Sequence, residues 1–199
     1  MTEEMDSKDL AERVRLIQSM IAEARQGTES WGWTFVLWGV AYYVAIAWAA
    51  WGKSNVAWPV TLTAAAIVTG IVASRKARNL PRTAIGRAIG SVWAAVGISM
   101  FVLMLTLGLH GFLDTQLFMG IVAAMLATAN AASGMILKWK VQLGCTLIWW
   151  VTCWVCDMGT AKRATITLLA AIFLCQIAFG TYAMVLESRR RRQSGAIHA

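Results

Sequence analysis

Long apolar stretches separated by short polar segments dominate this sequence from residue 33 onwards. Six of them contain no Asp, Glu, Lys, Arg or His. A helix crosses about 30 Å of hydrocarbon with about 20 residues, and only the fifth stretch is short, reaching full length with Lys140 and Asp157 at the interfaces. The pattern predicts an all-α membrane protein with six transmembrane helices in three hairpins. Their predicted ranges are 33–51, 56–74, 89–109, 115–137, 141–156 and 165–185.

A second pattern occupies residues 1–29, which precede the first apolar stretch. Its apolar residues recur at steps of three and four, the spacing of one helix face. They are Leu10, Val14, Ile17, Ile21 and Ala24. Acidic and hydroxyl residues from Asp6 onwards suit a helix start, and Arg25 and Gly27 suit its end. We therefore expect residues 1–29 to form a cytoplasmic amphipathic leader helix, with the apolar face between Asp6 and Arg25, and we expect no cleavable signal peptide.

The charge of the leader helix limits what it binds. Residues 1–29 hold seven acidic and four basic side chains, whereas a helix that lies on anionic lipid is basic. The leader is therefore expected to pack on basic cytoplasmic loops or on a cytoplasmic protein partner. The alternative is a solvated helix that only leads into the first span.

Composition agrees with a single membrane domain. Of 199 residues, 58% are hydrophobic and 14% charged, compared with about 45–50% and about 25% in soluble domains. We assign residues 30–187 to a six-helix bundle in the lipid bilayer and residues 188–199 to a basic tail. The net charge of +8 does not indicate nucleic-acid binding, because the basic residues lie in short segments between apolar spans.

Basic residues also predict the orientation in the membrane. A cytoplasmic basic loop between the second and third spans contains five of them: Arg75, Lys76, Arg78, Arg82 and Arg87. With the N-terminus inside, all eighteen Lys and Arg residues except Lys53, Lys162 and Arg163 face the cytoplasm. Because basic loops stay on the cytoplasmic side, both termini are predicted to be cytoplasmic and the protein to be multi-pass.

Polar residues within the spans are the candidates for chemistry, since they are costly in hydrocarbon. Asn130 and Gln176 are amides deep in the fourth and sixth spans, and Tyr182 lies further along the sixth. They form either interhelical hydrogen bonds or a polar path. The absence of ionisable residues from the spans disfavours a proton- or sodium-driven transporter, but a passive channel or facilitator for a small neutral solute needs none.

Cys153 and Cys156 have the spacing of a redox dithiol at the outer end of the fifth span. A membrane thiol oxidoreductase would use such a pair. However, a helix C-terminus beside Asp157 disfavours the thiolate, so packing is the preferred interpretation. The sequence predicts no metal site, because zinc needs four Cys or His ligands, and it predicts no cofactor.

Small residues form a stripe on the fourth span, where another helix backbone could approach closely. They are Gly120, Ala124, Ala127, Ala131 and Gly134. Gly86 and Gly90 have the same spacing at the start of the third span. Both sets are expected to pack within the monomer, with a homodimer interface as the second interpretation.

Short motifs in this order resemble an uncharacterised family of small six-span bacterial integral membrane proteins with an amphipathic N-terminal leader helix. The motifs are Trp31-Gly32-Trp33, Leu37-Trp38-Gly39, Ala73-Ser74-Arg75-Lys76, Val92-Trp93, Gly97-Ile98-Ser99 and Leu137-Lys138-Trp139-Lys140. The resemblance implies a bacterial plasma membrane protein and supplies no site residues. From the residues themselves, we expect a non-enzymatic binding or regulatory membrane component that presents a cytoplasmic surface to a partner.

Overall fold

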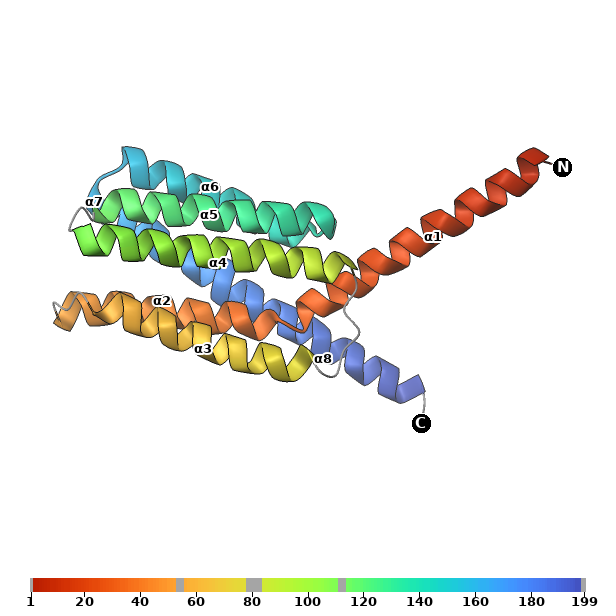
Figure 1. Ribbon diagram of the computed structural model, residues 1–199, viewed down its shortest axis with the longest axis horizontal. Coiled ribbons are helices and arrows are strands. Elements are labelled where there is room, and N and C mark those ends of the chain that lie inside the picture. Colours follow the sequence, from red (N-terminus) through yellow and green to blue (C-terminus); the bar gives the residue numbers. More distant parts are fainter. Residues whose placement is uncertain (1, 53–55, 78–83, 111–113, 198–199) are drawn as a thin grey trace.

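The computed structural model describes residues 2–52, 56–77, 84–110 and 114–197 (Figure 1). The described chain is 95% helical and contains no strand. Six of its helical stretches are long and apolar enough to cross a membrane. The predicted all-α membrane fold is therefore confirmed.

Nine helical segments follow one another in the described residues. They are α1 (Thr2–Glu29), α2 (Gly32–Gly52), α3 (Ala57–Ala77), α4 (Ala84–His110), α5 (Thr115–Ile136), α6 (Lys140–Met158), α7 (Ala161–Ile172), the π-helix η1 (Phe173–Ala178) and α8 (Phe179–Ile197). The last three are continuous and form one long rod, in which η1 is a local widening of the helix.

The leader helix α1 occupies almost all of residues 1–29. It begins at Thr2, so Asp6 lies within the helix instead of capping it, and it ends at Glu29. The backbone then turns at Ser30 and Trp31, whose amides bond back to the carbonyls of Gln26 and Thr28 at 3.1 and 3.0 Å. At this turn α1 leaves the bundle and projects away from it (Figure 1). We call this end of the molecule, where α8 also terminates, the leader end.

Helices at the leader end extend past the predicted spans. Arg75 and Lys76 continue α3, Arg87 lies in the first turns of α4, and α8 carries the arginines of the predicted tail. These basic residues were expected in a loop and in a separate tail, whereas the structure places them in continued helices. The physical reason is that Lys and Arg are good helix formers and prolong helices into water. Arg78 and Arg82 lie outside the described residues.

The most extensive packing between two described helices joins α5 to α6. The small-residue stripe of α5 faces α6, and a Cβ on Gly134 would lie only 3.2 Å from the backbone nitrogen of Leu143. The tight turn between the two helices has Lys138 at a positive φ of 50°. This turn buries Trp139 almost completely, so the residues between the helices contribute to the core.

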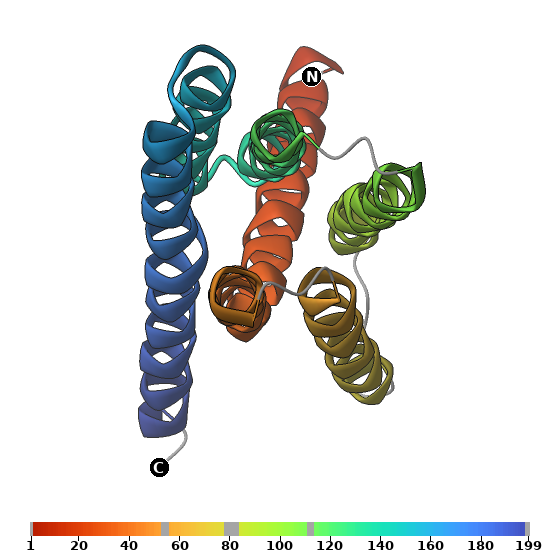
Figure 2. The ribbon, with the colours of Figure 1, turned by 90° about the vertical axis from the view of Figure 1, so that its left-hand side faces the viewer.

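Helices α3 and α4 form the side of the bundle away from the α7–α8 rod (Figure 2). Several of their large apolar side chains are exposed, among them Ile67, Ile98 and Phe101, which suits a surface facing lipid. A Cβ on Gly90 would meet nothing within 4 Å. The expectation that Gly90 packs within the monomer is therefore wrong: no helix in the described part of the chain covers this position.

Candidate functional site

An apolar stripe on α1 lies outside the bundle. Leu10, Val14 and Ile17 are 64%, 46% and 56% exposed, although they sit on one helix face. Their steps of four and three residues are those of a helix that packs along another helix. Further along the same face, Ile21 is half-buried and Ala24 is buried. The stripe therefore begins in the open and ends against the protein's own bundle.

Charged and aromatic contacts attach the base of α1 to the bundle. The Arg25 guanidinium lies 5.0 Å from the centre of the Trp139 ring, a cation–π distance. The Glu29 carboxylate lies 3.2 Å from Arg190 of α8 and 3.5 Å from Arg25. These contacts fix the direction in which the leader helix departs.

Glu29 is the most unusual of these residues, because its side chain is only 1% exposed. Burial raises the pKa of its carboxyl above the ordinary value, and the nearby Arg190 and Arg25 oppose this rise. Both carboxylate oxygens lack a hydrogen bond among the described residues, although Oε1 is within ion-pair distance of the two arginines. Arg25 and Arg190 are 34% and 41% exposed, so water solvates the cations better than the anion.

A chain of aromatic rings continues from this attachment into the bundle. Trp139 contacts Phe179 of α8 at 5.0 Å between ring centres, and Phe179 contacts Phe35 of α2 at 5.1 Å in an edge-to-face arrangement. Phe35 in turn meets Trp93 of α4 at 5.1 Å. The Nε1 of Trp93 donates a hydrogen bond to Ser133 Oγ of α5 at 3.0 Å. The base of the leader thus rests on a connected set of side chains from four spans.

Asn130 and Gln176 are both buried, whereas Tyr182 is exposed on the bundle surface. The Asn130 amide donates to Leu126 O of its own helix at 2.8 Å, and its Oδ1 has no partner in the described part of the chain. Gln176 lies in η1, where its Cβ packs against Gly39 of α2. The structure therefore places two of the three candidates in the core and the third outside it.

Sequence reasoning missed Gln142, which is fully buried on α6. Neither its Oε1 nor its Nε2 has a hydrogen-bond partner among the described residues. Gln142 lies only two residues after Lys140, a position that indicates the membrane boundary, so its burial was not expected. Helical spacing from Cys145 and Trp149, which are also buried, was the signal that could have placed it on the inward face.

Cys153 and Cys156 lie one turn apart on α6 and are both free thiols. Cys156 is fully buried, and its Cβ lies against Gly120 of α5, while Cys153 is half-buried. No group of three His, Cys, Asp or Glu side chains that could hold a metal ion occurs among the described residues. Cys156 therefore contributes to the contact between α5 and α6.

Comparisons of this chain with protein-family models, with curated proteins and with solved structures found no match.

Proposed function

We propose that this protein is a non-enzymatic membrane component that uses its leader helix to bind a cytoplasmic protein partner. The observation that supports this best is the exposed stripe of Leu10, Val14 and Ile17 on a helix that projects from the bundle. Burying such side chains contributes about 1.5–3 kcal/mol each when it is complete. An uncovered apolar stripe of this kind is therefore a suitable docking surface.

The distribution of charge favours a cytoplasmic location for this surface. Basic side chains gather at the leader end, on α1, α3, α4 and α8. Segments rich in Lys and Arg beside membrane spans remain on the cytoplasmic side. We extend the proposal to a bacterial plasma membrane on the strength of the family resemblance described above.

The acidic character of α1 favours a protein partner over the membrane surface. Among the first twelve residues, Lys8 is the single base, and there are five acids: Glu3, Glu4, Asp6, Asp9 and Glu12. Anionic lipid repels such a segment, and so does a parallel second copy of it. A helix or groove that is apolar at its centre and basic at its rim complements both features of α1.

A co-purification experiment tests this proposal. The full chain is extracted from its native host in gentle detergent, and the proteins that co-purify are identified by mass spectrometry. The same is done for Ile17→Glu, which places a charge in the stripe, and for Leu16→Glu, a matched control. Leu16 is 61% exposed but lies about 100° around the helix from Ile17.

A stoichiometric partner that is lost with Ile17→Glu and retained with Leu16→Glu would support the proposal. Removal of residues 2–20 should have the same effect as Ile17→Glu, and it leaves Ala24, Arg25 and Glu29 in place to hold the base of the helix. A partner that binds the truncated chain equally well would refute the docking role of the leader.

A further inference from the structure

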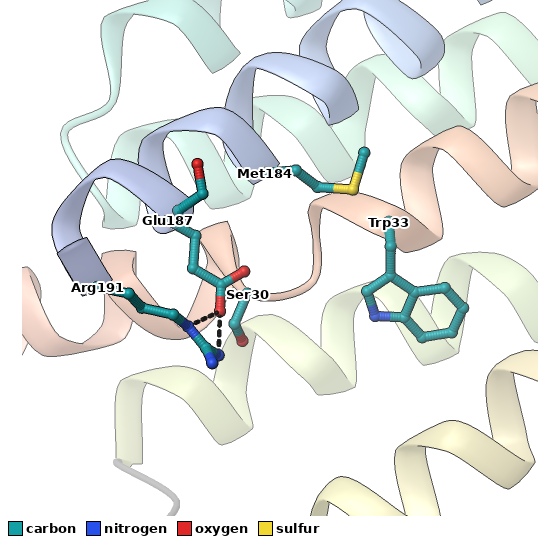
Figure 3. A pocket seen from close by; sticks show the side chains of 6 residues that line it. Ser30, Trp33, Met184, Glu187 and Arg191 are labelled. Atoms are coloured by element: carbon teal, nitrogen blue, oxygen red, sulfur yellow. Dashed lines mark hydrogen bonds and ion pairs between the residues drawn. The ribbon is translucent and has the colours of Figure 1, made fainter.

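A pocket lined by both polar and apolar side chains lies at the leader end, between the turn that joins α1 to α2 and the last turns of α8. Its volume is about 270 Å³. Six residues line it (Figure 3): Ser30, Trp33, Met184, Glu187, Ser188 and Arg191. Sites for drug-sized ligands begin at about 300 Å³, so this pocket suits a smaller polar group.

One side of the pocket offers hydrogen-bond acceptors. Arg191 bonds to a single oxygen of Glu187, Oε1, through Nε at 3.1 Å and Nη2 at 2.5 Å. In Figure 3 no dashed line reaches the second carboxylate oxygen of Glu187, which points to the side on which Trp33 lies. The Ser188 hydroxyl donates to the Val185 carbonyl at 2.9 Å, which leaves its oxygen as an acceptor. This arrangement suits a primary ammonium group.

The other side of the pocket offers donors. The Trp33 Nε1 is buried and has no acceptor among the described residues, and an unpaired buried N–H is costly. Arg191 has five N–H donors, of which Glu187 takes two. A phosphate oxygen is the acceptor that would satisfy both groups, because guanidinium and phosphate form strong charge-assisted bonds.

The pocket also sits where a phospholipid headgroup would lie. Trp33 is in the first turn of α2, whose following residues are apolar, and tryptophan marks the membrane–water interface. Met184 is one turn closer than Ser188 to the apolar part of the rod. A headgroup held between Glu187 and Arg191 would therefore leave its acyl chains on the membrane side.

We infer that this pocket binds the headgroup of a zwitterionic phospholipid with a primary amine, phosphatidylethanolamine. The ammonium group binds Glu187 and the Ser188 oxygen, and the phosphate binds Arg191 and Trp33 Nε1. Phosphatidylcholine has a quaternary ammonium that cannot donate a hydrogen bond to Glu187. Phosphatidylglycerol has no cation, so the carboxylate repels its headgroup. The inference is independent of the partner proposed for the leader.

Native mass spectrometry of the full chain tests this inference. The protein is delipidated in detergent and mixed with equal amounts of phosphatidylethanolamine, phosphatidylcholine and phosphatidylglycerol that carry identical acyl chains. We expect about tenfold preferential retention of phosphatidylethanolamine, which corresponds to about 1.4 kcal/mol. Soluble phosphoethanolamine is added in a separate arm, and we expect it not to displace the lipid.

Two variants and one control assign the preference to this pocket. Glu187→Gln should abolish the preference over phosphatidylglycerol, and Trp33→Phe, which keeps the ring and removes the N–H, should weaken retention of all three lipids. Arg192→Gln removes an exposed arginine outside the pocket and should change nothing. Trp33→Phe decides the question if Glu187→Gln fails to fold.

Several outcomes would overturn the inference. Equal retention of the three lipids would show non-selective annular lipid. Variants that match Arg192→Gln would place the binding elsewhere. Displacement of the lipid by soluble phosphoethanolamine would show a site for a free headgroup compound instead of a lipid.

Discussion

Gly180 of α8 is the position where one added methyl group should disturb the leader end most. A Cβ there would lie 2.6 Å from the carbonyl oxygen of Gly32, 2.8 Å from Val36 Cγ2 and 3.0 Å from Phe35 Cβ. The nearest of these atoms belongs to the backbone of α2, so no rotamer change relieves the contact. Ordinary contacts begin near 3.4 Å, and α2 and α8 must therefore move apart by most of an ångström.

Gly180→Ala is expected to lower the free energy of unfolding, and Gly90→Ala serves as its control. Overpacking costs about 1–3 kcal/mol, whereas alanine gains about 1 kcal/mol over glycine in a helix with open space. A Cβ on Gly90 meets nothing within 4 Å, so this variant should show only the gain. Because the gain in helix propensity applies to both helical positions, the two variants should differ by the overpacking cost, about 1–3 kcal/mol.

Denaturant unfolding of the full chain in detergent, followed by circular dichroism, measures this difference. The contact also lies beside the turn that carries α1, so separation of α2 from α8 should loosen the ion pair between Glu29 and Arg190. Equal stability of the Gly180→Ala and Gly90→Ala proteins would show that α2 and α8 do not pack backbone to backbone.

Three further predictions concern buried polar groups. Since burial raises the pKa of Glu29 above 4.5, the folded state binds more protons, and stability is lost as the pH rises through the folded pKa. Glu29→Gln should remove that loss of stability. The difference in melting temperature between the variant and the parent should therefore shift in favour of the variant as the pH rises, and a difference that is independent of pH would refute this prediction. Gln142→Leu should raise the free energy of unfolding by about 1–2 kcal/mol, because both polar atoms of the Gln142 amide lack partners among the described residues. Gln116→Leu should lower it, since Gln116 Nε2 donates to Cys156 O and Gly159 O. Chemical denaturation compares the two variants, and a loss of stability with Gln142→Leu would reveal a partner for that amide. Trp93→Phe should lower the free energy of unfolding by about 1 kcal/mol through the lost hydrogen bond to Ser133. A double-mutant cycle with Ser133→Ala should show a coupling energy between the two side chains, whereas additive effects of the two substitutions would contradict the prediction.

The six spans could be predicted from the sequence because the thickness of the bilayer imposes a length on every apolar run. Their ends were less predictable. Arg87 and Arg75 are charged, which indicates residues outside the hydrocarbon, yet both remain helical. Charge locates the membrane boundary, whereas helix propensity decides where the helix ends. At the leader end, the membrane boundary and the end of the helix therefore need not fall at the same residue.

In the candidate site, too, one part is predictable from the sequence and another part is not. The stripe of Leu10, Val14 and Ile17 is a local periodicity, so sequence alone could identify it. The buried Glu29 pairs with Arg190, near the other end of the chain, and with Arg25, which lies over the Trp139 ring. Such a contact exists only after the spans have assembled, and no local pattern predicts it.

Glu29 also explains how the bundle could influence what the leader binds. A leader attached by apolar contacts alone would keep its direction under most conditions, since those contacts respond weakly to charge. This leader is attached by one buried anion between two half-exposed cations, and the free energy of that arrangement changes with each charge nearby. Glu187 lies close enough to raise the pKa of Glu29, and it also lines the pocket at the leader end. A cationic group bound at Glu187 would therefore lower the cost of keeping Glu29 ionised, and the direction of α1 would be held more firmly when the pocket is occupied.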